Sequence, residues 1–417
     1  MNLFIYKIAL RSYQLLIKAA GPFNKKAKLW SEGRKDLIVK LRQSMKDNRG
    51  PVAWFHCASL GEFEQARPVI EKFKIQHSTF KILLTFFSPS GYEIRKNYEK
   101  ADYIFYLPLD SKRNARRFIE AAKPSIAFFV KYEFWYYYLN ELKKNQIPVI
   151  SFSAIFRKDQ LFFRRYGTFY KNILKKFNRI FVQNEESYYL LHAISIKHSE
   201  IAGDTRFDRV KEICDQKKNI PIAAKFKDAK KVLVIGSSWP QDMNLLIPFI
   251  NSFDKDLKVI VAPHELHERN LADMEGRIER KIIRFSRAEE SSVNQYDVLI
   301  IDNIGMLSSL YQYGEFAYIG GAFGKGLHNI LEAATYGMPV FFGPNYSKFH
   351  EAVALVNYGT AFPVNDRKEF TEQFAKFWQD ESFRLSVAAK SKNFVEKNTG
   401  ATEKILSYTK KILEEMR

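Results

Sequence analysis

Apolar and polar positions follow one another along this chain in blocks, with short apolar runs separated by longer amphipathic stretches. In the first half, runs of strand length occur in "PVAWFHCA", "KILLTFF", "YIFYLP", "SIAFFV", "IPVISF" and "RIFVQ". A second series follows residue 228, with "VLVIG", "LKVIVAP", "KIIRF", "DVLIID", "FAYIG" and "MPVFFG". Continuous apolar runs with helical connections are typical of parallel strands that are buried on both faces. The pattern therefore predicts an α/β protein with two tandem Rossmann-like domains.

The length of the chain supports two domains. A single core usually serves up to roughly 250–300 residues, and this chain has 417. The polar, proline-containing stretch "DQKKNIPIAAKFKDAKK" separates the two series of strands, so we place the boundary near 215–228. The expected parts are a basic segment at 1–49, a first domain at 50–215 and a second domain at 228–417, which ends in a helix.

The first twenty residues, "MNLFIYKIALRSYQLLIKAA", predict an amphipathic helix. Polar side chains recur on one stripe at Lys7, Arg11, Gln14 and Lys18, and the other positions include the apolar residues Leu3, Phe4, Ile8, Leu15 and Leu16. Charges at mid-length argue against a membrane-spanning helix and against a signal peptide. The pattern favours a helix lying in the headgroup plane of a membrane; a surface helix packed on the protein's own core is the alternative.

The formal net charge of +20 is the unusual feature of the composition. Residues 1–49 alone hold twelve Lys and Arg against three Asp and Glu. A surface this basic favours a polyanionic partner, which could be an anionic membrane, a phosphorylated substrate or nucleic acid. Residues 156–179 interleave basic and aromatic side chains, as nucleic-acid grooves do, although an ordinary solvated helix face would look the same. The two cysteines, Cys57 and Cys214, form no disulfide framework, which fits a cytoplasmic setting.

The stretch "WFHCASLGEFEQARPVI" places Glu62 where an apolar run gives way to helical spacing. Glu62 is therefore expected at the start of a helix, at the carboxyl end of a strand. In open α/β sheets this edge is where ligands bind. A carboxylate stabilised by the helix dipole is the simpler alternative.

Residues 318–344, "YIGGAFGKGLHNILEAATYGMPVFFGP", predict a strand, a glycine-rich turn and a helix that begins near His328 or Asn329. Glycines let the backbone approach a ligand, and a helix N-terminus offers free N–H groups to a phosphate. Glu332 would lie in the first turn, where its carboxylate could accept hydrogen bonds from a ribose diol. The spacing matches neither the dinucleotide-binding GxGxxG nor a P-loop, because Gly326 follows Lys325.

Five motifs in this order resemble those of the bacterial 3-deoxy-D-manno-octulosonic acid (Kdo) transferases of lipopolysaccharide assembly. They are "HCASLGE", "KYEFW", "GDTRFD", "IDNIGML" and "GGAFGKGLHNILEAATYGMPVFFGP", and the match runs in this order over nearly the whole length of the chain. Several positions depart from the family pattern, namely Lys131, Arg206, Met306 and Ala333, and "APHELHER" matches only roughly, with His264 near the family's arginine.

The resemblance implies the two-domain glycosyltransferase B fold, with CMP-Kdo as donor and a lipid A precursor, lipid IVA, as acceptor, without a metal or other cofactor. Sugar transfer needs a base for the acceptor hydroxyl, which the position of Glu62 suits, and the charge of the leaving phosphate could be stabilised by the glycine-rich loop, the helix dipole and Arg206. Glu133 matches the family's second functional glutamate, with a supporting role in orienting the acceptor or balancing charge. The resemblance also implies a place on the cytoplasmic face of the inner membrane. The residues matching the family's nucleotide contacts are Pro263, His264, Ile304, Gly305, Met306, Asn329, Ile330, Leu331 and Glu332.

Other functions were weighed against this one. A transferase or epimerase of the same fold that uses a UDP-sugar is one alternative, and a basic nucleic-acid-binding protein is another, although no nucleic-acid partner is expected. A "DKD" sequence at 254–256 matches the metal-binding DxD pattern but falls in a short polar loop. His264 and His267 lie close in sequence without the spacing of a zinc motif.

Overall fold

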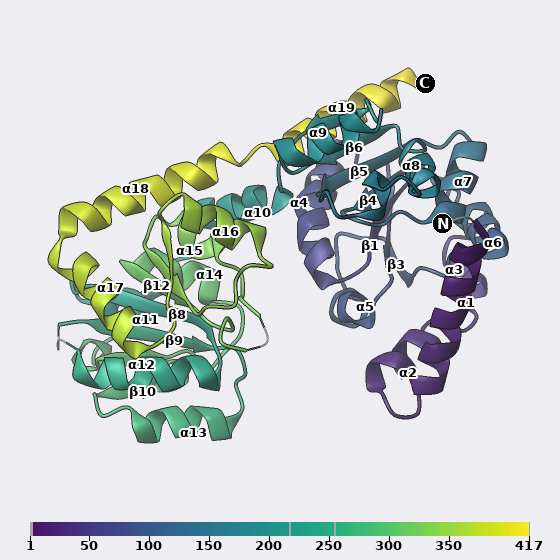
Figure 1. Ribbon diagram of the computed structural model, residues 1–417. Helices are drawn as coiled ribbons and strands as arrows, with labels where there is room; N and C mark the ends of the chain where they lie inside the picture. The colour runs from purple at the N-terminus through teal and green to yellow at the C-terminus, as the bar shows by residue number, and fades with distance from the viewer. Residues whose placement is uncertain (1–2, 217, 254–255, 325, 417) are drawn as a thin grey trace. The chain divides into compact units, whose positions relative to one another are not determined.

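The computed structural model describes residues 3–216, 218–253, 256–324 and 326–416, and the chain forms two compact units. Unit 1 comprises Met1–Arg209 and Gly400–Arg417, and unit 2 comprises Val210–Thr399 (Figure 1). The division falls inside α10 (Thr205–Asp215), a few residues before the expected boundary. The C-terminal helix, expected in the second domain, belongs to unit 1.

The centre of unit 1 is a parallel sheet of seven strands in the order β3-β2-β1-β4-β5-β6-β7. The strands are β1 (Val52–Cys57), β2 (Lys81–Phe86), β3 (Tyr103–Tyr106), β4 (Ile126–Val130), β5 (Val149–Ala154), β6 (Arg179–Val182) and β7 (Ser199–Ile201). The connecting helices are α4 (Leu60–Gln76), α5 (Pro89–Arg95), α6 (Lys112–Ala122), α7 (Tyr136–Lys144), α8 (Thr168–Leu174) and α9 (Glu185–Ala193), with a short 3₁₀ helix at Leu161–Phe163.

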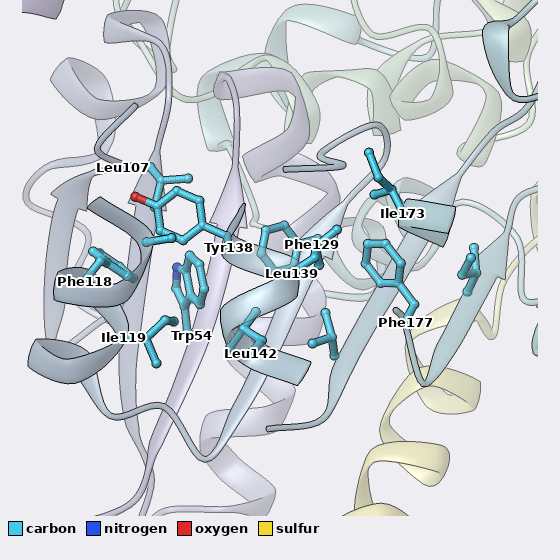
Figure 2. Close-up of a cluster of buried hydrophobic side chains, with 14 of the residues drawn as sticks. Trp54, Leu107, Phe118, Ile119, Phe129, Tyr138, Leu139, Leu142, Ile173 and Phe177 are labelled. Atoms are coloured by element: carbon cyan, nitrogen blue, oxygen red, sulfur yellow. The ribbon is translucent and has the colours of Figure 1, made fainter. Parts of the chain in front are cut away.

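Both faces of this sheet are buried, as the continuous apolar runs predict. Figure 2 shows one of the two cores, in which Trp54 packs against Phe118 and Tyr138. On the opposite face the rings of Phe55 and Phe128 stack with centroids 4.4 Å apart. The C-terminal helix α19 (Ala401–Glu415) packs against α4 and closes this second core.

Three helices precede the first sheet, namely α1 (Leu3–Ala20), α2 (Lys25–Glu32) and α3 (Leu37–Ser44), drawn in purple in Figure 1. The predicted N-terminal helix is therefore present. The hydroxyl of Tyr6 donates a hydrogen bond of 2.5 Å to the buried carboxylate of Asp110, which fastens α1 to unit 1. None of the described residues of α1 is buried, and large apolar side chains point to solvent on it, with exposed fractions of 66% for Phe4, 68% for Leu15 and 70% for Leu16. The helix is attached to the domain without being part of its core.

Unit 2 repeats the architecture with the strand order β10-β11-β9-β8-β12-β13-β14, again all parallel. The strands are β8 (Val232–Ser238), β9 (Lys258–Pro263), β10 (Ile282–Arg284), β11 (Val298–Ile300), β12 (Phe316–Ile319), β13 (Val340–Phe342) and β14 (Ala361–Pro363). Its helices are α11 (Pro221–Lys227), α12 (Pro240–Ser252), α13 (Glu268–Arg277), α14 (Leu307–Leu310), α15 (Leu331–Thr335), α16 (His350–Asn357), α17 (Arg367–Gln379) and α18 (Glu381–Lys397), with 3₁₀ helices at Phe285–Arg287, Val293–Gln295 and Tyr311–Tyr313.

Each predicted strand is present, and two parallel sheets confirm the predicted fold class. The strands β7 and β14 were not predicted; each has three residues and lies at a sheet edge. The helix after the glycine-rich turn was expected near His328 or Asn329, but α15 begins at Leu331 and has only five residues. That part of the prediction was wrong, because the residues from Leu327 to Ile330 form an irregular loop. Throughout the described ranges, no helix combines the length and apolarity that crossing a membrane requires.

Candidate active site

In unit 1 the strand order reverses at β1. The chain runs from β1 outward through β2 to β3 and then returns to place β4 on the other side of β1. In open parallel sheets, ligands bind outside the carboxyl ends of the strands at such a reversal. Glu62 follows β1 and Glu133 follows β4, so the two glutamates of the sequence prediction lie at this point.

Glu62 lies in the first turn of α4 and is half-buried. Its carboxylate accepts a hydrogen bond from the backbone N–H of Ala58. Burial raises the pKa of Glu62, and the neighbouring charge of Glu133 raises it further, to about 8. The N–H of Ala58 and the ammonium group of Lys131 act in the opposite direction without outweighing these effects. A carboxyl group with this pKa is a much stronger base than an ordinary glutamate.

Glu133 is only 8% exposed and is held by two ring nitrogens. The indole N–H of Trp135 donates to its Oε2 at 2.6 Å, and Nε2 of the fully buried His56 lies 3.0 Å from the same atom. The other ring nitrogen of His56 lies 2.9 Å from Oγ1 of Thr85, which also accepts from Trp54 at 2.8 Å. This chain of contacts connects Glu133 to the centre of the sheet.

The two carboxylates are therefore anchored at the carboxyl end of β1, one within the strand and one just after it. Glu133 contacts the side chain of His56, and Glu62 accepts from the backbone of Ala58, two residues further on. This spacing explains why the charge of Glu133 contributes to the raised pKa of Glu62.

Arg206 lies near the start of α10, in unit 1. Its guanidinium group donates to Oδ2 of Asp204 at 2.7 and 3.0 Å. Burial tends to raise the pKa of Asp204, but the charge and hydrogen bonds of Arg206 bring it below its ordinary value. The predicted donor-binding residues belong to unit 2, so the structure does not group Arg206 with them within one unit.

Unit 2 has its own reversal of strand order, at β8, which lies between β9 and β12. Trp239 follows β8, His264 follows β9 and His328 lies in the loop after β12. The rings of Trp239 and His264 stack with centroids 4.4 Å apart, and the indole N–H donates to Nε2 of His328 at 3.0 Å. Burial lowers the pKa of His328 to about 4, with a further contribution from His264, so the ring stays neutral and can accept this bond.

Asp242, in the first turn of α12, ties the glycine-rich loop to this group. Its buried carboxylate accepts hydrogen bonds from the backbone N–H groups of Trp239 at 2.8 Å and Gly321 at 2.9 Å. It also accepts one from the hydroxyl of Tyr318 at 3.1 Å. Gly321 has a φ of +97°, a conformation that residues with a Cβ rarely adopt. The loop is thus fixed close against the ends of β8 and β12.

Two predicted nucleotide-contact segments meet in unit 2. Glu332 lies in the first turn of α15, as predicted, and accepts from the hydroxyl of Ser308 at 2.7 Å and from the side-chain amide of Asn329 at 2.9 Å. Ser308 belongs to α14, which directly follows the segment Ile304, Gly305 and Met306. Of the other predicted contacts, Ile330 and Leu331 are buried, whereas Pro263 ends β9 and His264 is exposed beside Trp239.

Five residues of these sites are not among those predicted from the sequence, namely His56, Trp135, Trp239, His328 and Asp242. Trp239 follows the end of a predicted strand, and Asp242 comes three residues later, which is the spacing of a helix cap. That signal was available for these two. His56 and Trp135 lie in the quoted motifs "HCASLGE" and "KYEFW", but the contact of His56 with Glu133, 77 residues away, has no local signal.

Two possible metal sites were considered from the sequence, the DxD pattern at 254–256 and the pair His264 and His267. Within the described ranges, no group of three or more His, Cys, Asp or Glu side chains is arranged to hold a metal ion. The DxD candidate at 254–256 lies mostly outside the described residues. The ring of His264 instead stacks on Trp239 and lies 4.3 Å, between centroids, from the tilted ring of His328.

The chain resembles known proteins over most of its length. Residues 34–209 match the family model described as 3-deoxy-D-manno-octulosonic-acid transferase (kdotransferase). A 3-deoxy-D-manno-octulosonic acid transferase of Aquifex aeolicus is 29% identical over 80% of this chain and 82% of its own. One of Chlamydophila psittaci is 25% identical over 71% of this chain and 70% of its own.

Among solved structures, the UDP-GlcNAc 2-epimerase of Neisseria meningitidis bound to UDP-GlcNAc shares the fold. It has a TM-score of 0.60 and 17% identity, and the match covers 86% of this chain and 99% of that one. The MurG of Acinetobacter baumannii has a TM-score of 0.56 and 12% identity, over 87% of this chain and 99% of its own. The predicted glycosyltransferase B fold is thereby confirmed, and so is the resemblance to the Kdo transferases. Residues 34–209 match the Kdo transferase family model, and the similarity to Kdo transferases over most of the chain shows that the protein is a glycosyltransferase.

Proposed function

We propose that this enzyme transfers Kdo from CMP-Kdo to a hydroxyl group of a lipid A precursor, lipid IVA, with Glu62 as the general base and without a metal ion. The proposal is carried by the half-buried Glu62. Its pKa is raised to about 8, and it lies where the strand order of the first sheet reverses. The relatives named as 3-deoxy-D-manno-octulosonic acid transferases support the choice of sugar.

The chemistry needs one strong acceptor of a proton. The acceptor hydroxyl attacks the anomeric carbon of Kdo, its proton passes to Glu62, and the bond from that carbon to the phosphate oxygen of CMP breaks. General bases work best when their pKa lies near the working pH. The burial of Glu62 and its proximity to Glu133 supply such a pKa, and His56 and Trp135 hold Glu133 in place.

The donor would bind to unit 2 through its nucleotide. The carboxylate of Glu332 is an acceptor only, so it suits a ribose diol, and Ser308 and Asn329 already hold it in position. The segment Ile304, Gly305 and Met306 would contact the cytosine ring of CMP. The predicted role of Arg206 toward the leaving phosphate remains part of the proposal.

The same proposal places the enzyme on the cytoplasmic face of the inner membrane, where a lipid acceptor is reached. The exposed Phe4, Ile8, Leu15 and Leu16 of α1 would enter the headgroup boundary. The cations Lys7, Arg11 and Lys18 on the same helix would meet anionic lipid. Tyr6 would keep the helix fastened to unit 1 through Asp110.

The proposal is tested by incubating the full-length protein with CMP-Kdo and a tetraacylated lipid A precursor and weighing the lipid product. We expect a mass increase equal to one or more Kdo residues, which also counts the sugars added. A Glu62→Gln variant serves as the inactive control. An unmodified lipid, together with stabilisation of the protein by UDP-sugars and not by CMP, would instead favour a UDP-sugar enzyme of the same fold. Salt-dependent retardation of an oligonucleotide would favour nucleic-acid binding.

A further inference from the structure

Unit 2 contains a pocket of about 310 Å³ that the proposed function does not use. It lies beside the ends of β8 and β9, where the first turn of α12 meets α13. The residues of its wall that matter to the argument are Ser238, Trp239, Met243, Pro263, Arg269 and Asn270. The pocket touches the predicted nucleotide contacts at Pro263 only, so it provides space for a different part of a ligand.

Three polar side chains of the wall have no partner among the described residues. Ser238 is only 4% exposed, and its hydroxyl makes no hydrogen bond within the described ranges. A buried hydroxyl without a partner is costly, so such a group commonly marks a place where a ligand or water binds. In the part of the chain that is described, Arg269 forms no ion pair and the side-chain amide of Asn270 forms no hydrogen bond.

The acidic groups nearby are, with one exception, already engaged. The carboxylate of Asp273 accepts a hydrogen bond from Nη1 of Arg277 at 2.9 Å. The carboxylate of Asp242 accepts three hydrogen bonds, from Trp239, Gly321 and Tyr318. Glu265 also lines the pocket. The wall therefore offers the cation Arg269 together with acceptors and donors for hydroxyl groups.

The remaining wall is apolar and fixed. Trp239 cannot easily move, because its ring stacks on His264 and its N–H donates to His328. Met243 and Pro263 complete an apolar surface against which the C–H groups of a sugar ring can pack.

We infer that this pocket binds the acidic sugar of the donor, with the sugar's carboxylate on Arg269 and its hydroxyl groups on Ser238, Asn270 and Glu265. The inference rests on the proposed function and adds to it the means by which the enzyme distinguishes a sugar acid from a neutral sugar. A neutral sugar offers the exposed Arg269 no charged partner, whereas a carboxylate can receive two parallel hydrogen bonds from its guanidinium group.

Kinetics provide the first test. In Arg269→Gln we expect the KM for CMP-Kdo to rise about tenfold to a hundredfold, as for the loss of a charged hydrogen bond, while the inhibition constant of CMP stays within twofold. Arg269→Lys should recover part of the loss, because it keeps the charge without the planar fork. The matched control is Arg367→Gln, which removes the same charge from the first residue of α17 in unit 2 and does not line the pocket. Equal KM values in Arg269→Gln and the control would overturn the inference.

A binding measurement separates the inference from the proposed function. Trp239 labelled with 5-fluorotryptophan gives a ¹⁹F signal that can be assigned with Trp239→Phe. Free Kdo should shift this signal in the wild type, a neutral heptose should not, and the shift should be lost in Arg269→Gln. A shift by Kdo in a protein that transfers no Kdo would contradict the proposed function and support the pocket. Transfer of Kdo without any such shift would contradict the pocket and leave the proposed function standing.

Discussion

The two candidate sites both lie where a parallel sheet reverses its strand order, but they are built in different ways. In unit 1, Glu62 follows a fully buried strand and begins a helix of 17 residues, and Glu133 is bound to the buried His56. In unit 2, the predicted nucleotide contacts lie at the end of β9, on loops and in the short helix α15, with Ile304 91% exposed. One site is held by the core, and the other is presented at the surface.

This difference corresponds to the two tasks. A general base needs a raised pKa, which comes from burial and a fixed neighbouring charge. A nucleotide needs accessible backbone and side-chain groups, and loops on a rigid scaffold supply them. Substitutions in unit 1 should therefore affect the rate of transfer and its pH dependence, whereas substitutions in unit 2 should affect the affinity for the donor.

The largest expected effect is that of Glu62→Gln. Because the amide cannot accept the proton of the acceptor hydroxyl, transfer should fall about 10²–10⁴-fold, the usual contribution of a general base. The affinity for CMP should not change, because the nucleotide contacts lie in unit 2. Initial rates of product formation and calorimetric titration with CMP check the two parts.

Glu64→Gln is the matched control, because Glu64 lies two residues further along α4 and pairs with Arg95 at 2.8 Å. It should retain nearly full activity. A Glu62→Gln enzyme that works within tenfold of the wild type would remove Glu62 from the role of base and would end the functional contrast between the two units.

The next effect belongs to unit 2. Glu332→Ala should weaken the binding of CMP by about 1.5–3 kcal/mol, because hydrogen bonds to a charged acceptor are lost. The maximal rate at saturating donor should change much less. Titration with CMP measures this effect, and Glu351→Ala, which alters the first turn of the neighbouring α16, is the control. Unchanged CMP affinity would show that Glu332 only holds Ser308 and Asn329 in place.

Much of the fold was predictable because a strand that is buried on both faces of a sheet is a continuous run of apolar residues in the sequence. The strands β1 and β8 are apolar over nearly their whole length, and both were identified. The edge strand β7 (Ser199–Ile201) is mostly polar and β14 (Ala361–Pro363) ends in a proline, so neither forms a recognisable apolar run, although the identified strands β10, β11 and β13 are equally short. The position of Glu62 followed from a local pattern, since a strand end and a helix start are both readable.

The surroundings of the glutamates were not predictable in this way. His56 and Glu133 are 77 residues apart, and they meet only because β4 returns to lie beside β1. The stacking of Trp239 with His264 likewise depends on the neighbouring strands β8 and β9. Strand order is a tertiary property, so the raised pKa of Glu62 could be explained only after the sheet was known.

The pH dependence sharpens the contrast further. If Glu62 must be ionised to act, the transfer rate of the wild type should rise with pH through a midpoint near 8. Removing the negative charge of Glu133 favours the ionised form of Glu62, so Glu133→Gln should move the midpoint to lower pH, by roughly one unit. The midpoint of the profile, and not its height, is the quantity to compare, because Glu133→Gln is also expected to lower the maximal rate. A midpoint that stays near 8 in Glu133→Gln would mean that burial alone sets the pKa.

Other titratable groups near Glu62 could also shift the midpoint of the pH profile. Among the described residues whose charge acts on Glu62 or responds to it are Lys131, Tyr132 and Cys57. Burial raises the pKa of Tyr132 and Cys57 above their ordinary values, so both stay neutral near pH 8. Glu64→Gln should again keep the wild-type profile.

The smallest effect on the chemistry itself should come from α1, which lies outside both sites. Replacing the exposed Phe4, Leu15 and Leu16 together by Ser should weaken binding to anionic liposomes at least tenfold, because burying one such side chain contributes about 1.5–3 kcal/mol. Replacing Lys7, Arg11 and Lys18 by Gln should weaken it by about 1 kcal/mol per charge, and only this contribution should disappear in high salt.

Both triple variants should transfer Kdo to a delipidated, soluble acceptor within about twofold of the wild-type rate, since they leave Tyr6 and its bond to Asp110 intact. Cosedimentation with liposomes and rates on the two acceptors separate attachment from catalysis. Apolar variants that cosediment as well as the wild type would show that the exposed face of α1 does not meet the membrane. Variants that lose activity equally on both acceptors would show instead that α1 supports the fold of unit 1, because a membrane anchor cannot affect a reaction in which no membrane takes part.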